Sequence, residues 1–247
     1  MRRLRWSLAT LAFLVVAGVT FVSCLSHTLP QGTTGPEADA LAHRLEKGAA
    51  IDDWARTGAV RFTFRNDTHH LWDRTRNLDR VRWGDDEVLL DVAKQTGRAT
   101  HKGRVLRGEE ADELVKKAYA RFCNDTFWLN PLAKLFDDGV TRSRAVDKDG
   151  ESLLVHYASG GTTPGDTYQW LIGEGDVPRA WRMFVHVIKI KGLEMTWQDW
   201  QTLSTGARVA TRHRALGLDA LKLTDIVGGA TLADVEPGPD PFAAILQ

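Results

Sequence analysis

Two histidines and two aspartates are the residues of this sequence best suited to acid/base chemistry. His156 and His186 belong to separate predicted strands and could meet in the fold, with Asp125 or Asp166 beside them. Such a set would serve proton transfer or bind a hard metal ion. Their spacing does not require them to converge, and histidines are more often satisfied core or surface residues. We therefore expect no metal, no cofactor and no catalytic residue, and keep a hydrolytic enzyme built on these four residues as an alternative.

One loop has an unusual composition. Residues 160 to 166 are Gly-Gly-Thr-Thr-Pro-Gly-Asp and separate two predicted strands. The pattern is typical of a Pro-Gly turn in which an aspartate holds the backbone. The functional alternative is that Thr162, Thr163 and Asp166 form the polar rim of a pocket. The sequence contains no phosphate-loop, nucleophile-elbow, His-Glu-x-x-His or Cys-x-x-Cys motif, so no familiar chemistry is indicated.

Aromatic residues carry more information than the polar ones. The chain has nine tryptophans, and the predicted strand around residues 181 to 188 is apolar at both sets of alternating positions, which requires cover on both faces. Core packing would explain this pattern, and an apolar cavity for a ligand is the functional alternative. The predicted cavity residues are Trp72, Tyr119, Phe122, Trp128, Trp170, Trp181, Met183 and Trp197.

These residues must be positioned by one long helix and many short strands. Apolar residues recur at helical spacing from Ala111 to Phe122, after Gly108 and an acidic first turn. We expect this helix to reach a cap and turn near Asn124-Asp125. Shorter helices are expected at residues 37–47 and 51–56, and the remaining pattern, including strands at 58–65 and 179–191, has period two. The predicted fold class is α+β, mostly antiparallel β: a curved incomplete β-barrel with one central helix and short N-terminal helices packed on it.

The N-terminus has the pattern of an exported lipoprotein. Three arginines precede an uncharged apolar run, and Val22-Ser23-Cys24 closes it, with Phe21 where leucine is usual. We predict a signal peptide at 1–23, lipidation of Cys24, a flexible tether at 24–36 and a single domain at 37–247 with a docked C-terminal tail. An uncleaved membrane anchor and ordinary cleaved secretion are the alternatives. In all three cases the domain lies outside the cytoplasm.

Charge excludes one class of function. The whole chain has 32 basic and 32 acidic side chains, and loss of Arg2, Arg3 and Arg5 with the leader would leave 29 basic against 32 acidic. The basic residues are interleaved with acids, so no basic face for nucleic acid is expected. Cys123 would be the single cysteine left for the domain, and we expect a buried thiol.

Several short motifs resemble an uncharacterised family of bacterial envelope proteins associated with the LolA/LolB-like lipoprotein fold. The motifs are Trp72-Asp73, residues 124–129 (Asn-Asp-Thr-Phe-Trp-Leu), residues 137–140 (Asp-Asp-Gly-Val), residues 161–168 (Gly-Thr-Thr-Pro-Gly-Asp-Thr-Tyr) and residues 197–200 (Trp-Gln-Asp-Trp). The resemblance covers residues 57 to 242. It implies an incomplete β-barrel closed by helices around an apolar cavity, and no established activity.

The leading hypothesis is a lipid-anchored protein of the bacterial cell envelope, held at the outer membrane and facing the periplasm. It would bind an acyl chain, a lipoprotein or another amphiphile in the half-barrel cavity, as a monomer and without chemistry. The alternative to both binding and hydrolysis is an assembly or structural partner in the envelope that takes no small ligand.

Overall fold

The computed structural model describes residues 25–159 and 163–246. The predicted signal peptide and Cys24 lie outside the described residues, as does Thr162. No helix in the described ranges is both long enough and apolar enough to cross a membrane.

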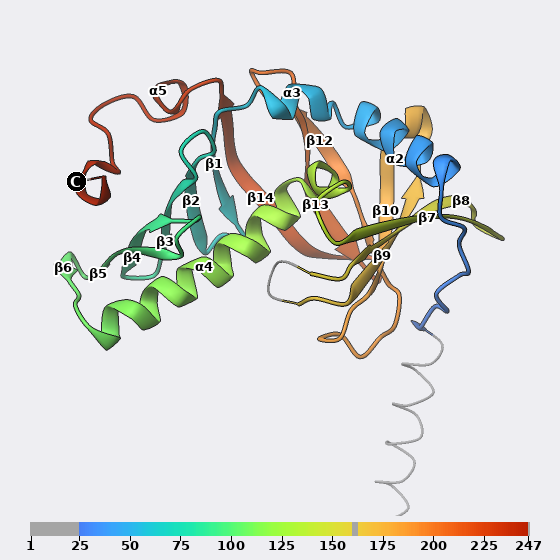
Figure 1. Ribbon diagram of the computed structural model, residues 1–247, viewed down its shortest axis with the longest axis horizontal. Helices are drawn as coiled ribbons and strands as arrows, with labels where there is room; N and C mark the ends of the chain where they lie inside the picture. The colour runs from blue at the N-terminus through green and yellow to red at the C-terminus, as the bar shows by residue number, and fades with distance from the viewer. Residues whose placement is uncertain (1–24, 160–162, 247) are drawn as a thin grey trace, which may run out of the picture.

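Two antiparallel sheets form the framework (Figure 1). The larger has nine strands in the order β12-β13-β14-β1-β2-β3-β4-β5-β6 and the smaller has five in the order β11-β10-β9-β8-β7. The α+β, mostly antiparallel class is therefore confirmed, and the sheets do not close into a barrel. The nine strands are β1 Ala59–Phe64, β2 Thr68–Asp73, β3 Leu78–Trp83, β4 Asp86–Asp91, β5 Thr96–His101, β6 Arg104–Val105, β12 Gln198–Thr202, β13 Arg208–Ala215 and β14 Leu218–Gly229. The five are β7 Val140–Asp147, β8 Gly150–Tyr157, β9 Asp166–Ile172, β10 Pro178–Phe184 and β11 Leu193–Thr196.

The larger sheet has two different faces because side chains alternate along each strand. Val60 and Phe62 of β1 and Val81 of β3 are fully buried on one face, which we call the helix face. Arg61 of β1 and Arg80 of β3 project from the opposite, outer face. The sequence pattern of β1 predicted this alternation correctly.

Helix α4, Glu109–Leu129, crosses the helix face obliquely (Figure 1). Gly108 is its N-cap with a positive φ of 60°, and three acids occupy the first turn, where the helix dipole favours negative charge. Its apolar stripe packs on the core made by β3, β4 and β5. The predicted turn at Asn124-Asp125 is wrong: helical hydrogen bonding continues to Leu129, and the chain leaves the helix at Asn130, just before Pro131 disfavours helical backbone.

The two N-terminal helices lie beside different sheets: the first lies beside β7 and β8 of the smaller sheet, and the second lies beside β13 of the larger sheet. Helix α2, Pro36–Gly48, buries Leu41 and Leu45, and helix α3, Ile51–Ala55, buries Trp54. The Arg74 guanidinium lies 4.3 Å from the centre of the Trp54 ring, a cation–π distance. Both helices appear along the top edge of Figure 1.

The segment predicted to be a flexible tether makes main-chain bonds to the domain. Thr33 exchanges two hydrogen bonds of 2.9 Å with Arg144 at the free edge of β7, and the His27 amide donates to the Lys191 carbonyl at 2.8 Å. Gly32 packs so closely on Ser143 that an added Cβ would lie 2.8 Å from it. The edge strand β7 has unpaired backbone groups that can bond to this segment, and the composition of the segment does not reveal them.

The strand predicted at residues 179–191 is interrupted. β10 ends at Phe184, and the chain turns back so that Met183 pairs with Leu193 of β11. Val187 in this turn is 73% exposed. An apolar run is therefore split between a buried strand and an exposed loop, a distinction that periodicity does not make.

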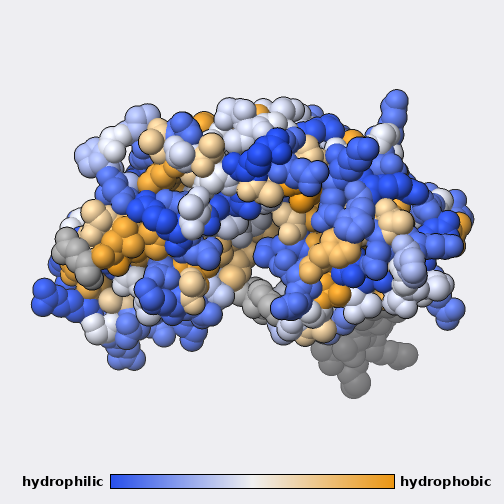
Figure 2. Space-filling view, turned by 45° about the horizontal axis from the view of Figure 1, so that its top comes forward, coloured by the Kyte–Doolittle hydropathy of each residue, from blue (hydrophilic) through white to orange (hydrophobic). Residues whose placement is uncertain are grey.

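The C-terminal tail lies on the outer face of the larger sheet. Short helix α5, Leu232–Val235, packs Val235 against Ala59 and Leu71. Phe242 is fully buried with Leu78 and Leu89. The face shown in Figure 2 is largely hydrophilic, with separate apolar patches.

Candidate functional site

A pocket of about 410 Å³ lies between the two sheets, beside the C-terminal half of α4. Helix residues Tyr119, Phe122, Cys123 and Phe127 share a flank of α4 by their spacing and form one wall. The larger sheet contributes Trp72, and the smaller sheet contributes strands β8 and β9. This size falls within the range of small-molecule sites, about 300–1,000 Å³.

The interior of the pocket is aromatic. Trp72 and Phe122 meet edge to face with ring centres 5.2 Å apart. Across the pocket, Phe127 contacts Tyr157 at 5.4 Å and Tyr168 at 5.3 Å. Because aromatic rings offer large, rigid apolar surfaces, these walls suit a hydrocarbon chain.

Two polar atoms in these walls are buried without a hydrogen-bond partner in the described part of the chain: Trp72 Nε1 and Tyr157 Oη. Burial, and then the neighbouring Tyr168 and Asp137, raise the pKa of Tyr157 far above its ordinary value, so the hydroxyl stays protonated and can donate. Buried donors without acceptors are destabilising, and a bound water or ligand oxygen would satisfy them.

The rim of the pocket is polar. Thr163 and the nearly buried Asp166, two of the three residues proposed as a polar rim, are among the residues that line the pocket. Asn124 of α4 also lines the pocket, as do Lys134 and Asp137 of the segment after the helix. Lys134 and Asp137 form an exposed ion pair of 3.2 Å. The site thus combines an aromatic interior with a charged, wet entrance.

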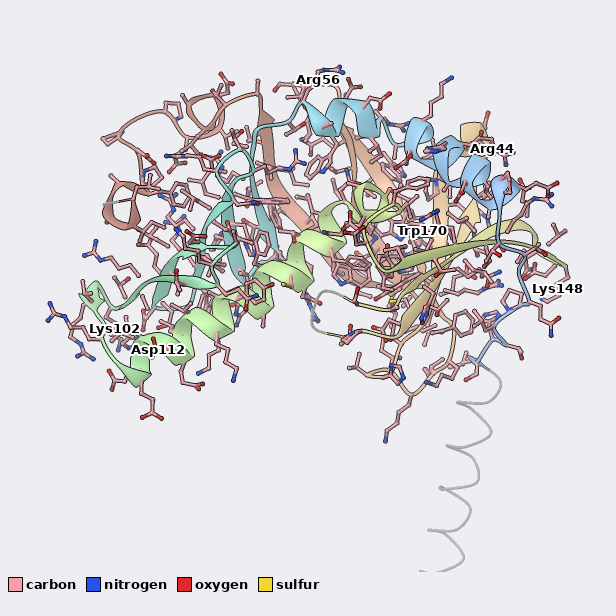
Figure 3. All side chains as sticks on the ribbon, in the orientation of Figure 1. Arg44, Arg56, Lys102, Asp112, Lys148 and Trp170 are labelled. Atoms are coloured by element: carbon pink, nitrogen blue, oxygen red, sulfur yellow. The ribbon has the colours of Figure 1, made fainter. Side chains whose placement is uncertain are left out.

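The structure divides the predicted cavity residues into two groups. Trp72, Tyr119, Phe122 and Trp128 line the pocket. The other four, Trp170, Trp181, Met183 and Trp197, do not line it but lie in the main buried core. The three tryptophan rings pack against one another, with 4.9 Å between the Trp170 and Trp181 centres. Trp170 is labelled in Figure 3. Alternation along β9 and β10 does not distinguish a ring facing a pocket from one facing other rings.

Of the four predicted acid/base residues, the described contacts bring together one pair, His186 and Asp166. His186 Nδ1 lies 3.2 Å from an oxygen of Asp166, which also accepts the His186 amide at 3.2 Å. His156 instead hydrogen-bonds Thr167 at 3.0 Å, and Asp125 belongs to a different cluster. No joint site of His156, His186 and a carboxylate is therefore formed by these contacts.

That cluster is a buried Asp-His-Asp bridge between α4 and the larger sheet. His70 Nδ1 lies 2.7 Å from Asp79 Oδ2, and His70 Nε2 lies 3.0 Å from Asp125 Oδ2. All three side chains are almost completely buried, and His70 stacks on Phe62 at 4.6 Å. Asn124 Nδ2 donates to the second oxygen of Asp125 at 2.7 Å.

Opposing effects act on the His70 pKa. Burial lowers it, but the Asp79 charge and the hydrogen bonds to both aspartates raise it further, to about 9. The imidazole is therefore protonated at neutral pH and donates from both nitrogens. It fastens α4 to β2 and β3 by two charge-assisted hydrogen bonds.

The sequence patterns did not reveal this bridge. Asp125 interrupts the apolar stripe of α4, three residues after Phe122 and four before Leu129, and a carboxylate in such a position needs a buried partner. That departure was the available signal. Within residues 25–159 and 163–246, no group of three or more metal-binding side chains is arranged around a common point.

No family model matches the sequence, and no curated protein matches it. Among solved structures, the chain is similar to the crystal structure of a DUF1329 family protein from Desulfovibrio piger ATCC 29098. The two share 10% sequence identity with a TM-score of 0.40, over 85% of this chain and 99% of the other. A likeness of this strength does not establish a common fold.

Proposed function

We propose that this protein binds an acyl chain, a lipoprotein or another amphiphile in the aromatic pocket, and that it does so without chemistry. The observation that carries the proposal is the pocket itself: rings inside, ionic and amide groups at the entrance. Hydrocarbon gains about 0.8 kcal/mol per buried CH₂ group, while a head group at the entrance keeps its contact with water. Lys134, Asn124 and Thr163 stand where such a head group would lie.

The partnerless donors support an amphiphile over a pure hydrocarbon. Trp72 Nε1 and Tyr157 Oη are buried in the pocket walls without acceptors among the described residues. An ester or carboxyl oxygen at the head of an acyl chain would accept from them. Each such hydrogen bond contributes about 0.5–1.5 kcal/mol.

The setting we propose is the bacterial cell envelope. Lipidation of Cys24 would hold the domain at the outer membrane, facing the periplasm, and the two sheets would act as an incomplete, LolA/LolB-like half-barrel. The leader pattern and the short motifs support this part of the proposal. A lipid-anchored monomer could then present its pocket to amphiphiles of the same compartment.

Cys123 offers a direct test because its thiol lines the pocket and is a free cysteine. In a Cys24→Ser chain it is the single cysteine, since the sequence has two. Its modification by a thiol reagent should slow when a long-chain fatty acid is added, and the protection should strengthen as the chain lengthens from eight to about fourteen carbons.

The matched control moves the cysteine around the same helix. In a Cys24→Ser, Cys123→Ser chain, Ala120→Cys places a thiol at an exposed position of α4, and its labelling rate should not respond to the fatty acid. Equal responses at positions 120 and 123, or no response at either up to the solubility limit of the lipids, would refute binding in the pocket.

A further inference from the structure

We infer that the outer face of the larger sheet carries a second site, which binds phosphate or a phosphate monoester. A groove of about 410 Å³ lies there, on the other side of the sheet from α4. Arg61 of β1, Arg80 and Arg82 of β3, and His69 of β2 line it together with Asp225 and Glu236. This site is independent of the aromatic pocket.

Strand register brings the basic residues together. Leu71 pairs with Arg61 on one side and with Arg80 on the other, so these two arginines lie two strands apart, about 10 Å. In the next row on the same face, His69 pairs with Thr63 and with Arg82. Three arginines from two strands therefore share one patch of the outer face.

One half of the groove already binds a carboxylate. Glu236 of the C-terminal tail lies 2.8 Å from Arg80 Nη2 and 3.4 Å from Arg61 Nη1. Hydrogen bonding to Arg80, in which the carboxylate accepts, lowers the Glu236 pKa. The Glu236 carboxylate thus shows that Arg61 and Arg80 can bind one acidic group together.

The other half of the groove has unused basic groups. The Arg82 side chain is exposed and makes no ion pair or hydrogen bond with the described residues, even though Glu87 is its cross-strand neighbour on β4. Arg80 Nε is buried without an acceptor in the same described part of the chain. Asp225, the second carboxylate, already accepts hydrogen bonds from Thr63 at 2.9 Å and Thr224 at 3.2 Å.

Phosphate suits this arrangement better than a single carboxylate does. A guanidinium presents a planar fork that binds two oxygens of one anion, and phosphate has enough oxygens for more than one arginine. Three arginines outnumber the two carboxylates of the groove by one charge, and by two once an incoming anion displaces Glu236, so a phosphate dianion in place of Glu236 would balance the groove. A phosphate monoester could come from a free metabolite or from the head group of an acidic lipid.

The test compares three variants of the full-length protein by titration with inorganic phosphate at low ionic strength. Arg82→Gln should weaken binding about tenfold or more, because it removes a charge-assisted, two-point contact. Glu236→Gln should strengthen binding several-fold, because it removes the competing carboxylate from Arg61 and Arg80. Arg179→Gln, which removes an exposed arginine of β10 on the other sheet, is the control and should change nothing.

A second titration, with dihexanoyl phosphatidic acid, a lipid that stays monomeric, distinguishes a free metabolite from a lipid head group. Inorganic phosphate should displace this lipid, and Arg82→Gln should weaken the binding of both. Tighter binding of the lipid assigns the site to an acidic head group, and equal binding assigns it to free phosphate monoesters. Absence of saturable phosphate binding, or equal effects of Arg82→Gln and Arg179→Gln, would overturn the inference, as would a Glu236→Gln variant that keeps its fold and binds no more tightly.

Discussion

The buried His70 bridge makes stability depend on pH in a direction that can be worked out. The His70 pKa is raised from 6.5 to about 9 in the folded protein. The shift of about 2.5 pH units, at about 1.4 kcal/mol each, corresponds to about 3 kcal/mol. Because the side chain is fully buried, solvent screening does not reduce this value as it would at the surface.

The sign follows from which state holds the proton. Between pH 6.5 and 9 the folded protein keeps the proton on His70 while the unfolded chain has released it, so the stabilisation falls as pH rises. The full contribution of about 3 kcal/mol is present below pH 6.5, and about 1 kcal/mol remains at pH 8. The loss is complete above pH 9.

Urea unfolding of the wild type and His70→Gln at pH 6, 7 and 8 measures this contribution. The difference in unfolding free energy between the two proteins should shrink by about 2 kcal/mol across this interval. Histidine-selective NMR of the wild type provides the control that does not need a folded variant. A His70 resonance that titrates near pH 6.5, or a free-energy difference that does not change with pH, would refute the bridge as described.

Three further outcomes are expected. His213 is the opposite case to His70, because burial lowers its pKa to about 4 while its hydrogen bond to the Thr196 carbonyl acts in the other direction. The free energy of unfolding should therefore fall as pH drops from 6.5 to 4. In the same urea series, His213→Gln should reduce that fall. Trp181→Ala should cost about 3–5 kcal/mol of unfolding free energy, as Phe62→Ala should, because both side chains are fully buried; a loss below about 1 kcal/mol for Trp181 would place its ring in an open cavity. Metabolic labelling with a fatty-acid analogue should tag the wild type and not Cys24→Ala. Equal tagging of both proteins would refute the proposed lipid anchor.

Much of the fold could be predicted from local patterns. The alternation of β1 and the apolar stripe and acidic first turn of α4 each follow from the spacing of a few residues, and the structure confirms both elements. Errors arose where the deciding interaction is remote. The chain at residues 185–192 leaves the sheet because Met183 pairs with Leu193, and a strand edge captures Thr33.

The candidate site shows the same division. Sequence spacing places Tyr119 and Phe122 on α4, but a pocket wall also needs Trp72 from a strand and Tyr168 from the other sheet. Which tryptophans face the pocket depends on the relative placement of two sheets. Period-two patterns contain no information about that placement.

Helix α4 connects the bridge to the pocket, and this connection gives the buried charges a role. Asp125 holds the helix to the larger sheet through His70, while Phe127, two residues later, packs directly against Tyr168 of the smaller sheet. A purely apolar contact would allow the helix to slide or rotate at low cost, whereas the charge-assisted hydrogen bond from His70 to Asp125 restricts its rotation, and Asp79 holds the imidazole in place for that bond. The aromatic flank of the helix therefore keeps a fixed distance from the opposite wall. Loss of the His70 proton should loosen this end of α4 first, so affinity for an amphiphile should fall over the same pH interval as stability.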